Sequence, residues 1–557
     1  MFFAKKHLGI RRSFNFSFIL FQSFLFFFKN QKSGIHSFRA LFNFYKNNFL
    51  LYLLILILLS LLSYHKVLGF AFWKDDWYGI YQKDHLNSFL LHPGATLEWI
   101  FLSKLFGENT FFWQLTGIIL RILDSVAIYL MMQKLTKSRI AGFLSRIFFA
   151  STFGALDTVG WASAHISSIA IFFMCLSVYF WLKFYEDLKN KNFLLYFIFL
   201  ILAMLADPIR VVPIIILLAF LRKTIFKENK NSKFAKIIQG SFYLFLVLVF
   251  LFVFWYLNLT GYPGFSLIPK IIDSPSYVLN KSYLIGNYWG SLGNLILGWI
   301  ISIPENASTG EYNKLYARIA FILVPFLSIF IFLFYRLRSG KFAIAAFLIS
   351  WILVFYLPNW IAEPRLTMGG THRFLNFSTV GFIGLFAYGI SFIKLRFLLI
   401  SFSVFFVAMN IITSNRILVQ ESKYRSKEIV EAVWNKIDND FPKNEKDSIF
   451  IYRGEEPLRG NILALSGSIP IGIKRNIKDP YDFPIVTDDL DLIVKLLCFE
   501  NVTRFQPGKY VIQKERIPIN NIHAWEIKNN GSIINISKME RERIRKFAEV
   551  KCKVIEN

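Results

Sequence analysis

Long apolar runs recur along the chain from about Asn48 to Thr413 and alternate with short polar loops. Most are close to the roughly 20 residues that an α-helix needs to cross the hydrocarbon core of a bilayer. The pattern predicts crossings at residues 49–69, 111–133, 139–152, 163–182, 193–206, 208–221, 237–257, 315–335, 342–357, 373–392 and 397–413. We therefore expect a mainly α, polytopic membrane protein with about eleven transmembrane helices.

Two stretches allow a second interpretation. Residues 193–206 and 208–221 are short and separated only by Asp207, so one kinked helix is the alternative. A single helix would leave a basic loop on the outer side, which favours two segments. Residues 283–303 are apolar but rich in Gly, Asn and Trp, and we interpret them as re-entrant or interfacial for the same reason.

The flanking regions have a different pattern. Residues 1–48 form a basic N-terminal segment whose Phe14 to Phe28 run favours an interfacial helix over a cleaved signal. Residues 49–413 form the transmembrane domain, and residues 414–557 a small α+β domain. In that last domain we expect an amphipathic helix at 421–438 and strands at 448–452, 469–473 and 510–513.

Charge then orients the helices. The chain is 55% hydrophobic and carries a formal net charge of +27, and its surplus Lys and Arg gather in loops on alternate sides of the apolar runs. This is the positive-inside pattern, so we place the N-terminus in the cytoplasm and the C-terminal domain outside. The same distribution argues against nucleic-acid binding. Most carboxylates of the membrane half then face outward, which favours outward-facing chemistry or cation binding.

The three cysteines, Cys175, Cys498 and Cys552, have neither the spacing of metal ligands nor that of a disulfide framework. A bridge between Cys498 and Cys552 is an alternative that the sequence does not favour. Paired carboxylates can hold a hard divalent cation, and arginines alone can neutralise a phosphate, so the sequence leaves metal involvement open.

The first outer loop has two adjacent carboxylates, Asp75 and Asp76, at the point where a membrane helix ends. Desolvation and mutual repulsion suit such a pair to general-base chemistry, and a solvated interfacial belt with Trp73 and Trp77 is the other interpretation. His92 lies further along the same loop.

The next helix contains Arg121 and Asp124, three residues apart, which can form an internal ion pair or serve a function. Asp157 and His165 lie around the following outer loop, where an interfacial histidine with a structural partner is an equal alternative.

Arginines mark two later outer loops. Arg210 follows the Asp207-Pro208 break, where it can bind a phosphate or simply pair with Asp207. Arg365, His372 and Arg373 lie where the chain re-enters the membrane. Arginine suits bidentate phosphate recognition better than lysine, so we favour a phosphate site at Arg365 and Arg373.

In this order the elements resemble the C-type superfamily of membrane glycosyltransferases, which includes protein O-mannosyltransferases and bacterial aminoarabinose transferases. The resemblance covers about residues 50–413 and rests on Asp75-Asp76, His92-Pro93, Arg121 within its helix, Gly160-Trp161-Ala162-Ser163, and Arg373-Phe374-Leu375. Gly94 and Phe374, which stands where an aromatic hydroxyl is common, depart from the usual pattern.

The resemblance implies a polyprenyl-phosphate sugar donor, a first-loop base at Asp75 or Asp76, and arginines that hold the donor phosphate. Membrane lipids and a glycan, lipid or protein acceptor are the other expected partners. The rival functions are a transporter or flippase without chemistry, and a polymerase or ligase of lipid-linked glycans.

Overall fold

The computed structural model describes residues 49–74, 76–82, 93–215, 217–218, 282–299, 340–362, 371–442, 445, 447–464, 466–477, 482–506 and 509–556. Residues 59–557 form one compact unit, and all contacts given below lie within it. The expected crossings at 237–257 and 315–335, and most of the one at 208–221, lie outside the described residues.

The described part is mostly helical and confirms a polytopic membrane protein. Six helical stretches are long and apolar enough to cross a bilayer: Leu51–Gly69, Thr110–Thr136, Ala162–Asp187, Phe342–Trp360, Arg373–Ile390 and Arg396–Arg425. They correspond to six of the crossings expected from the sequence. The total of eleven stays a prediction.

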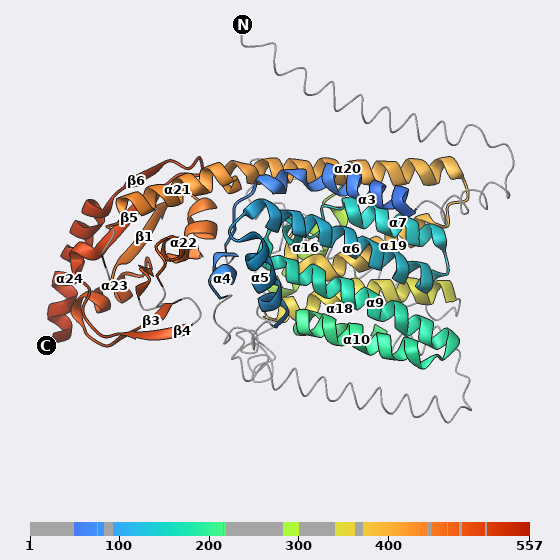
Figure 1. Cartoon of the computed structure of the whole chain (residues 1–557), viewed down its shortest axis with the longest axis horizontal. Coiled ribbons are helices and arrows are strands. Elements are labelled where there is room, and N and C mark those ends of the chain that lie inside the picture. Colours follow the sequence, from blue (N-terminus) through green and yellow to red (C-terminus); the bar gives the residue numbers. More distant parts are fainter. Residues whose placement is uncertain are drawn as a thin grey trace, which may run out of the picture. The chain divides into compact units, whose positions relative to one another are not determined.

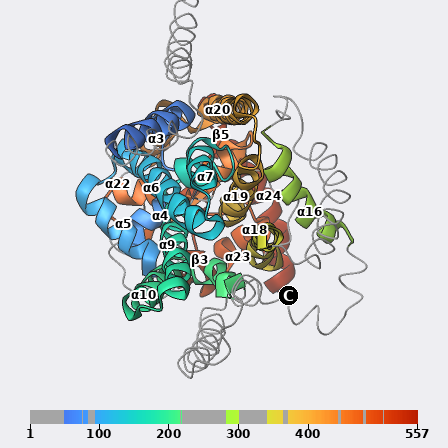
Figure 2. The ribbon, with the colours of Figure 1, turned by 90° about the vertical axis from the view of Figure 1, so that its right-hand side faces the viewer.

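The bundle is built from α3 (Phe49–Tyr64), α6 (Thr110–Thr136), α7 (Arg139–Ser151), α9 (His165–Asp187), α10 (Asn190–Ala206), α18 (Gly340–Ala362), α19 (Asn376–Ile390) and α20 (Arg396–Arg425). Figure 2 looks roughly along these helices, with α6 and α9 on one side and α18 and α19 on the other. A single buried apolar cluster, including Met131, Phe148, Trp351 and Ile383, joins both sides.

Local signals explain where the helices end. Asn109 caps α6 by accepting a hydrogen bond from the N–H of Phe111, and Ser138 caps α7 by accepting one from the N–H of Ala141. Asp207, with φ −147°, ends α10, and α11 (Pro208–Val211) begins at the next residue. The break between the two segments is therefore real up to the last described residues of this region.

Helix α16 (Ser282–Leu297) occupies the stretch expected to be re-entrant or interfacial. It packs against α18, where the hydroxyl of Tyr356 donates a hydrogen bond to Ser291 Oγ at 2.9 Å. Residues 300–303 lie outside the described residues, and the re-entrant assignment stays a prediction.

The C-terminal domain has a four-stranded sheet of order β2-β1-β5-β6. Strand β1 (Ile449–Gly454) is parallel to β2 (Ile485–Val486) and β5 (Ile522–Ile527), and β6 (Ile533–Asn535) is antiparallel to β5. A separate hairpin joins β3 (Val502–Gln506) and β4 (Lys509–Gln513). Helices α21 (Lys427–Asp440), α22 (Ile469–Lys474), α23 (Leu490–Cys498) and α24 (Ser537–Glu556) complete the expected α+β fold.

Two expectations for this domain were wrong in detail. The strand expected at 469–473 is helix α22, in which Pro470 occupies the first turn and Gly472 packs directly against the ring of Phe483. The helix expected at 421–438 is two helices, because Ser426 adopts an extended conformation between α20 and α21. Helix α20 runs without a break through the expected domain boundary at 413, as Figure 1 shows, and that boundary stays a prediction.

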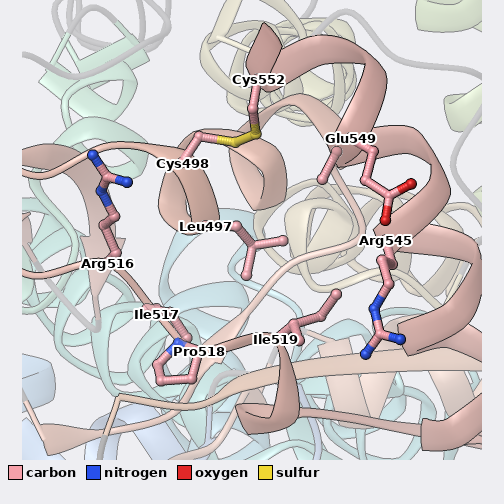
Figure 3. A pocket seen from close by; sticks show the side chains of 10 residues that line it. Leu497, Cys498, Arg516, Ile517, Pro518, Ile519, Arg545, Glu549 and Cys552 are labelled. Atoms are coloured by element: carbon pink, nitrogen blue, oxygen red, sulfur yellow. A yellow bond between two sulfur atoms is a disulfide. The ribbon is translucent and has the colours of Figure 1, made fainter.

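Cys498 and Cys552 form a disulfide, which corrects the expectation from their spacing. Val494 of α23 and Ala548 of α24 pack together and bring the two sulfur atoms into reach. Figure 3 shows the bridge at the wall of a pocket of about 510 Å³, lined also by Arg516, Arg545 and Glu549. Tertiary packing across 54 residues of sequence decides this pairing.

The C-terminal domain holds the loop that follows the first membrane helix. Phe70 and Ser426 form an isolated antiparallel bridge, and the N–H of Ala71 donates to the carbonyl oxygen of Arg425 at 2.9 Å. The hydroxyl of Ser466 donates to the carbonyl oxygen of Lys74 at 2.7 Å. The first loop is thus fixed from two places in the C-terminal domain and the end of α20.

Candidate functional site

The starts of α6, α9 and α19 and the ends of α10 and α18 lie at one end of the bundle, which we call the site end. The polar residues singled out from the sequence meet there in two groups.

Asp76 fixes the first loop at the site end. Its side chain is 3% exposed, and its two oxygens accept hydrogen bonds from the N–H groups of Trp73 and Ser163, both at 2.7 Å. Asp76 begins the short helix α4 (Asp76–Gln82) and ties it to the turn before α9. Both oxygens of Asp76 therefore hold the loop in place. Asp75 and His92 lie outside the described residues.

Asp157 begins the short helix α8 (Asp157–Gly160) and lies against the last described loop before α19. Its N–H donates to the carbonyl oxygen of Thr371 at 3.0 Å, and its carboxylate accepts a hydrogen bond from the N–H of Arg373. Burial raises the pKa of Asp157, while the positive charges of Lys74, Arg425 and Arg373 act in the opposite direction. Asp157 is thus a buried carboxyl group with three cations around it.

Aromatic rings position these cations. The guanidinium carbon of Arg373 lies 3.9 Å from the ring centroid of Trp161, and Lys74 Nζ lies 4.6 Å from the same centroid. Arg425 lies over Trp73, at 4.4 Å, and donates a hydrogen bond to the carbonyl oxygen of Gly160. We call Lys74, Asp157, Arg373, Glu421 and Arg425 the Asp157 cluster.

Arg425 links this cluster to α20. Its side chain is 2% exposed, and its Nη1 lies 2.6 Å from Glu421 Oε2 one helical turn earlier. Three cations and two carboxylates leave the cluster with a formal charge of +1. An excess of positive charge in a desolvated place favours binding of an anion.

Arg210 forms the second group, which adjoins the first. Its guanidinium donates to Asp207 Oδ2 at 2.6 Å, to Asn359 Oδ1 at 2.8 Å and to Ser167 Oγ at 2.8 Å. The structural alternative left open by the sequence, a turn with a paired Asp and Arg, is therefore present. Arg210 also lies 4.6 Å from the ring of Phe374, the residue after Arg373.

His372 supports the same turn. Its Nδ1 accepts a hydrogen bond from the N–H of Phe374 at 3.2 Å, and its ring packs edge-on against the Phe374 ring. The 3-10 turn at Arg373–Leu375 follows directly and leads into α19. Arg365 lies outside the described residues.

His165, at the start of α9, pairs with Glu98 of α5 (Pro93–Phe106). Its Nδ1 lies 3.0 Å from Glu98 Oε1, and the His165 side chain is fully buried. Burial raises the pKa of Glu98, and the hydrogen bond from His165 acts in the opposite direction. The pair lies two residues from Ser163, which binds Asp76.

Arg121 has a different place and different partners from those the helical spacing suggested. Its Nη2 donates to the carbonyl oxygens of Thr152 and Gly154, at 3.1 and 2.6 Å, and its guanidinium lies 4.2 Å from the ring of Phe149. Among the described residues, Asp124 forms no ion pair with it. The internal pair is therefore wrong, and Arg121 holds the turn after α7.

The structure thus brings Asp76, Asp157, Arg210, His372 and Arg373 to the site end and leaves Arg121 inside the bundle. Sequence reasoning missed Lys74, Glu98, Glu421 and Arg425. Lys74 adjoins the acidic pair, which was the one available signal. Arg425 lies twelve residues beyond the expected end of the last crossing, in a part assigned to the soluble domain.

The described residues contain no group of three or more His, Cys, Asp and Glu side chains that could hold a metal ion. The surroundings of Asp157 do not fit a divalent cation, because three positive side chains already compensate its carboxylate. Metal involvement elsewhere in the chain stays open.

Comparisons with known proteins add two distant structural likenesses. No protein family matches the sequence, and no curated protein matches it. One solved structure, an Archaeoglobus fulgidus oligosaccharyltransferase tethered with an acceptor peptide, has 14% identity and a TM-score of 0.42 over 73% of this chain and 62% of its own. Another, oligosaccharyltransferase AglB from Archaeoglobus fulgidus with an inhibitory peptide and a dolichol-phosphate, has 13% identity and a TM-score of 0.43 over 80% and 65%. The chain spans less than two thirds of the length of either structure.

Proposed function

We propose that this chain is a membrane glycosyltransferase that moves a sugar from a polyprenyl-phosphate carrier to an acceptor on the outer face of the membrane. One observation carries the proposal. A buried acid, Asp157, and three cations share one small cluster at the site end, with Arg373 held flat against Trp161. Sugar transfer from a lipid phosphate needs acid–base chemistry and phosphate binding side by side.

The cations of the cluster would bind the donor phosphate. Arg373 lies closest to the centre, and Lys74 and Arg425 flank it around Trp161 and Trp73. A guanidinium matches the geometry of phosphate oxygens, and its electrostatic stabilisation grows as charge develops on the departing phosphate. Arg210, placed beside Phe374, is the reserve phosphate ligand in this proposal, since three hydrogen bonds already occupy it.

The general base in this proposal comes from the first loop. Asp76 already accepts two main-chain hydrogen bonds, so we assign it the task of holding the loop. Asp75, its neighbour, is then the carboxylate for the acceptor. Asp157, whose pKa burial raises, is the second candidate for proton transfer.

The chemistry is a single displacement with inversion. The carboxylate takes the proton of the acceptor hydroxyl while the acceptor oxygen forms a bond to the anomeric carbon. The bond between that carbon and the phosphate oxygen breaks, and the lipid phosphate leaves with the electron pair. Arg373 and its neighbours compensate the extra negative charge, which needs no other reactant.

The Cys498–Cys552 bridge supports an outer-face site. Disulfides persist in oxidising compartments and are rare in the cytosol. The C-terminal domain that carries the bridge also contacts the first loop through Ser466 and Lys74. The bridge and the loop would therefore lie on the same side of the membrane, in agreement with the positive-inside pattern.

The test is sugar transfer by the purified protein in liposomes that contain a radiolabelled polyprenyl-phosphate sugar. A transferase consumes the label and releases lipid phosphate when acceptor is added. A flippase only moves the intact label between leaflets, and a glycan polymerase needs a diphosphate-linked glycan instead. Label that stays intact with every acceptor class would exclude the proposal.

A further inference from the structure

A row of buried polar side chains lies between α5, α6 and α9 and has no part in the proposed sugar transfer. Its members are Glu98, Gln114, Asp124, His165 and Ser168, and we call them the polar stripe. Seven of their oxygen and nitrogen atoms are buried without a hydrogen-bond partner: Glu98 Oε2, both amide atoms of Gln114, both carboxyl oxygens of Asp124, His165 Nε2 and Ser168 Oγ.

These side chains follow the contact between two neighbouring helices. His165 Nε2 lies against Gly117 of α6, where a Cβ atom would come within 2.7 Å of it. Asp124 is two turns further along α6, and Ser168, one turn along α9, faces its carboxyl group. Gln114 lies one turn from Gly117 in the other direction. The stripe thus begins at the Glu98–His165 pair and runs along one helix face to Asp124.

The stripe stops in the middle of the bundle. Cys175, ten residues or about 15 Å into α9 from His165, lies beside Asp124. Beyond it, α6 and α9 contact each other through apolar side chains such as Ile128, Met131 and Val178. The opening at the other end is Glu98, the only member with 9% of its surface exposed.

Buried polar groups without partners are costly, most of all inside a membrane, and a protein keeps them where something completes their hydrogen bonds. Water does this when a site offers it two to four polar partners, as the closely spaced oxygens and nitrogens of the stripe do. Arg121 cannot serve, because the carbonyl oxygens of Thr152 and Gly154 occupy it.

We propose that the polar stripe binds a short chain of water molecules that enters at the Glu98–His165 pair and ends at Asp124. The chain exchanges protons between the Asp124 carboxyl group and the compartment at the site end, and it does not continue to the opposite face. Each proton step makes one O–H bond and breaks another, so it needs no further reactant. The titratable or charged groups that face the stripe are Glu98 of α5, Arg121 and Asp124 of α6, and His165 and Cys175 of α9.

Cys175 is a built-in probe of this chain. It is buried and is the free cysteine of the chain, since the other two of the three cysteines form the disulfide. Its S–H stretching band lies in an infrared window without other protein bands, and it shifts when the thiol proton exchanges in D2O. Exchange needs water or a proton carrier at the thiol. Otherwise it waits for the helices to open.

The experiment follows this band in the protein in liposomes without donor, so its outcome does not depend on the proposed transferase activity. The matched control carries Cys175→Ala and Leu200→Cys, which places the thiol at a fully buried position of α10 outside the stripe. We expect Cys175 to exchange more than about tenfold faster than this control, because only the control must wait for local opening. Equal rates would overturn the proposal.

Two further variants test the path. Gln114→Leu lies between Asp124 and the site end and should slow the exchange of Cys175 to the control rate. Gln133→Leu, the same substitution on the other side of Asp124 in α6, should leave it unchanged. A thermal melt of each variant checks folding. Slowing by Gln133→Leu alone would mean entry from the opposite face and would also overturn the proposal.

Discussion

Arg210 and Arg373, from helices far apart in the sequence, contact the same aromatic ring. Their guanidinium carbons lie 4.6 and 5.3 Å from the centroid of Phe374. Arg210 is held by Asp207, Asn359 and Ser167, whereas Arg373 lies against Trp161 within the Asp157 cluster. One ring therefore couples the fixed arginine to the one that we propose binds phosphate.

Replacing Arg373 by Ala should weaken donor binding by roughly ten- to a hundredfold, because a lost charge-assisted hydrogen bond costs about 1.5–3 kcal/mol. The measurement is equilibrium binding of a polyprenyl-phosphate sugar to the purified variant. Arg416→Ala is the matched control, since Arg416 is exposed on α20. Unchanged affinity in the Arg373 variant would move the phosphate site elsewhere, with Arg210 the next candidate.

Replacing Asp75 by Asn should lower turnover by about 10²–10⁴-fold while donor affinity is kept, because an amide cannot act as a general base. Replacing Asp76 by Asn should also lower the melting temperature, because the amide group would meet one of the two main-chain N–H donors. Turnover and thermal melts of both variants separate the two roles. Near-normal turnover in both would contradict a first-loop base, and divalent-ion dependence in both would favour a metal site.

Asp438 should give the C-terminal domain a stability that is lost in acid. Although desolvation acts to raise its pKa, hydrogen bonds from Lys474 and Arg475 at 2.8 Å lower it from the usual value of 3.8. A depressed pKa means that this stabilisation is present above about pH 4 and disappears as the pH falls below it. Melting curves of the full chain between neutral and acid pH should therefore show a smaller acid loss in Asp438→Asn. Identical pH dependence in both proteins would contradict this assignment.

Reduction of Cys498–Cys552 should destabilise the C-terminal domain by about 2–5 kcal/mol, as is usual when a native disulfide is removed. Thiol alkylation of the denatured protein should modify one cysteine, Cys175, before reduction and three afterwards. Cys498→Ser with Cys552→Ser should reproduce the loss, and Cys175→Ser should not. Three reactive thiols in the unreduced protein would contradict the bridge and its support for an outer location.

A reporter that is active only outside the cytoplasm should work when fused after Asn557. The six basic clusters and the disulfide both predict this orientation. The same reporter fused within residues 134–139, the basic turn after α6, should be silent. The reverse pattern would place the Asp157 cluster in the cytoplasm and remove the outer-face proposal.

Sequence alone located elements whose signal is local. The apolar runs gave the membrane helices, and Asp207-Pro208 marked the break between α10 and α11. The same reasoning failed where the signal is ambiguous or distant. Ile469 to Ile473 alternates like a strand, yet Pro470 starts a helix there.

Side-chain partners were harder to predict than helices. Helical spacing places Asp124 near Arg121, but it cannot reveal that carbonyl oxygens of the turn after α7 compete for the guanidinium. Arg425 reaches Gly160 only because α20 outlasts its apolar part by three turns. Such contacts depend on the distance between helix ends, which hydropathy does not record.

The unbroken length of α20 has a consequence for how this chain tolerates insertions. One residue added or removed between Thr413 and Glu421 would turn the rest of the helix by about 100° and shift it by about 1.5 Å. Glu421 and Arg425 would then point away from Gly160 and Asp157, although no side chain had been replaced. Seven added residues would nearly restore the direction but lift Arg425 by about 10 Å. The spacing between the last membrane crossing and Arg425 is therefore as much a part of the site as the arginine itself.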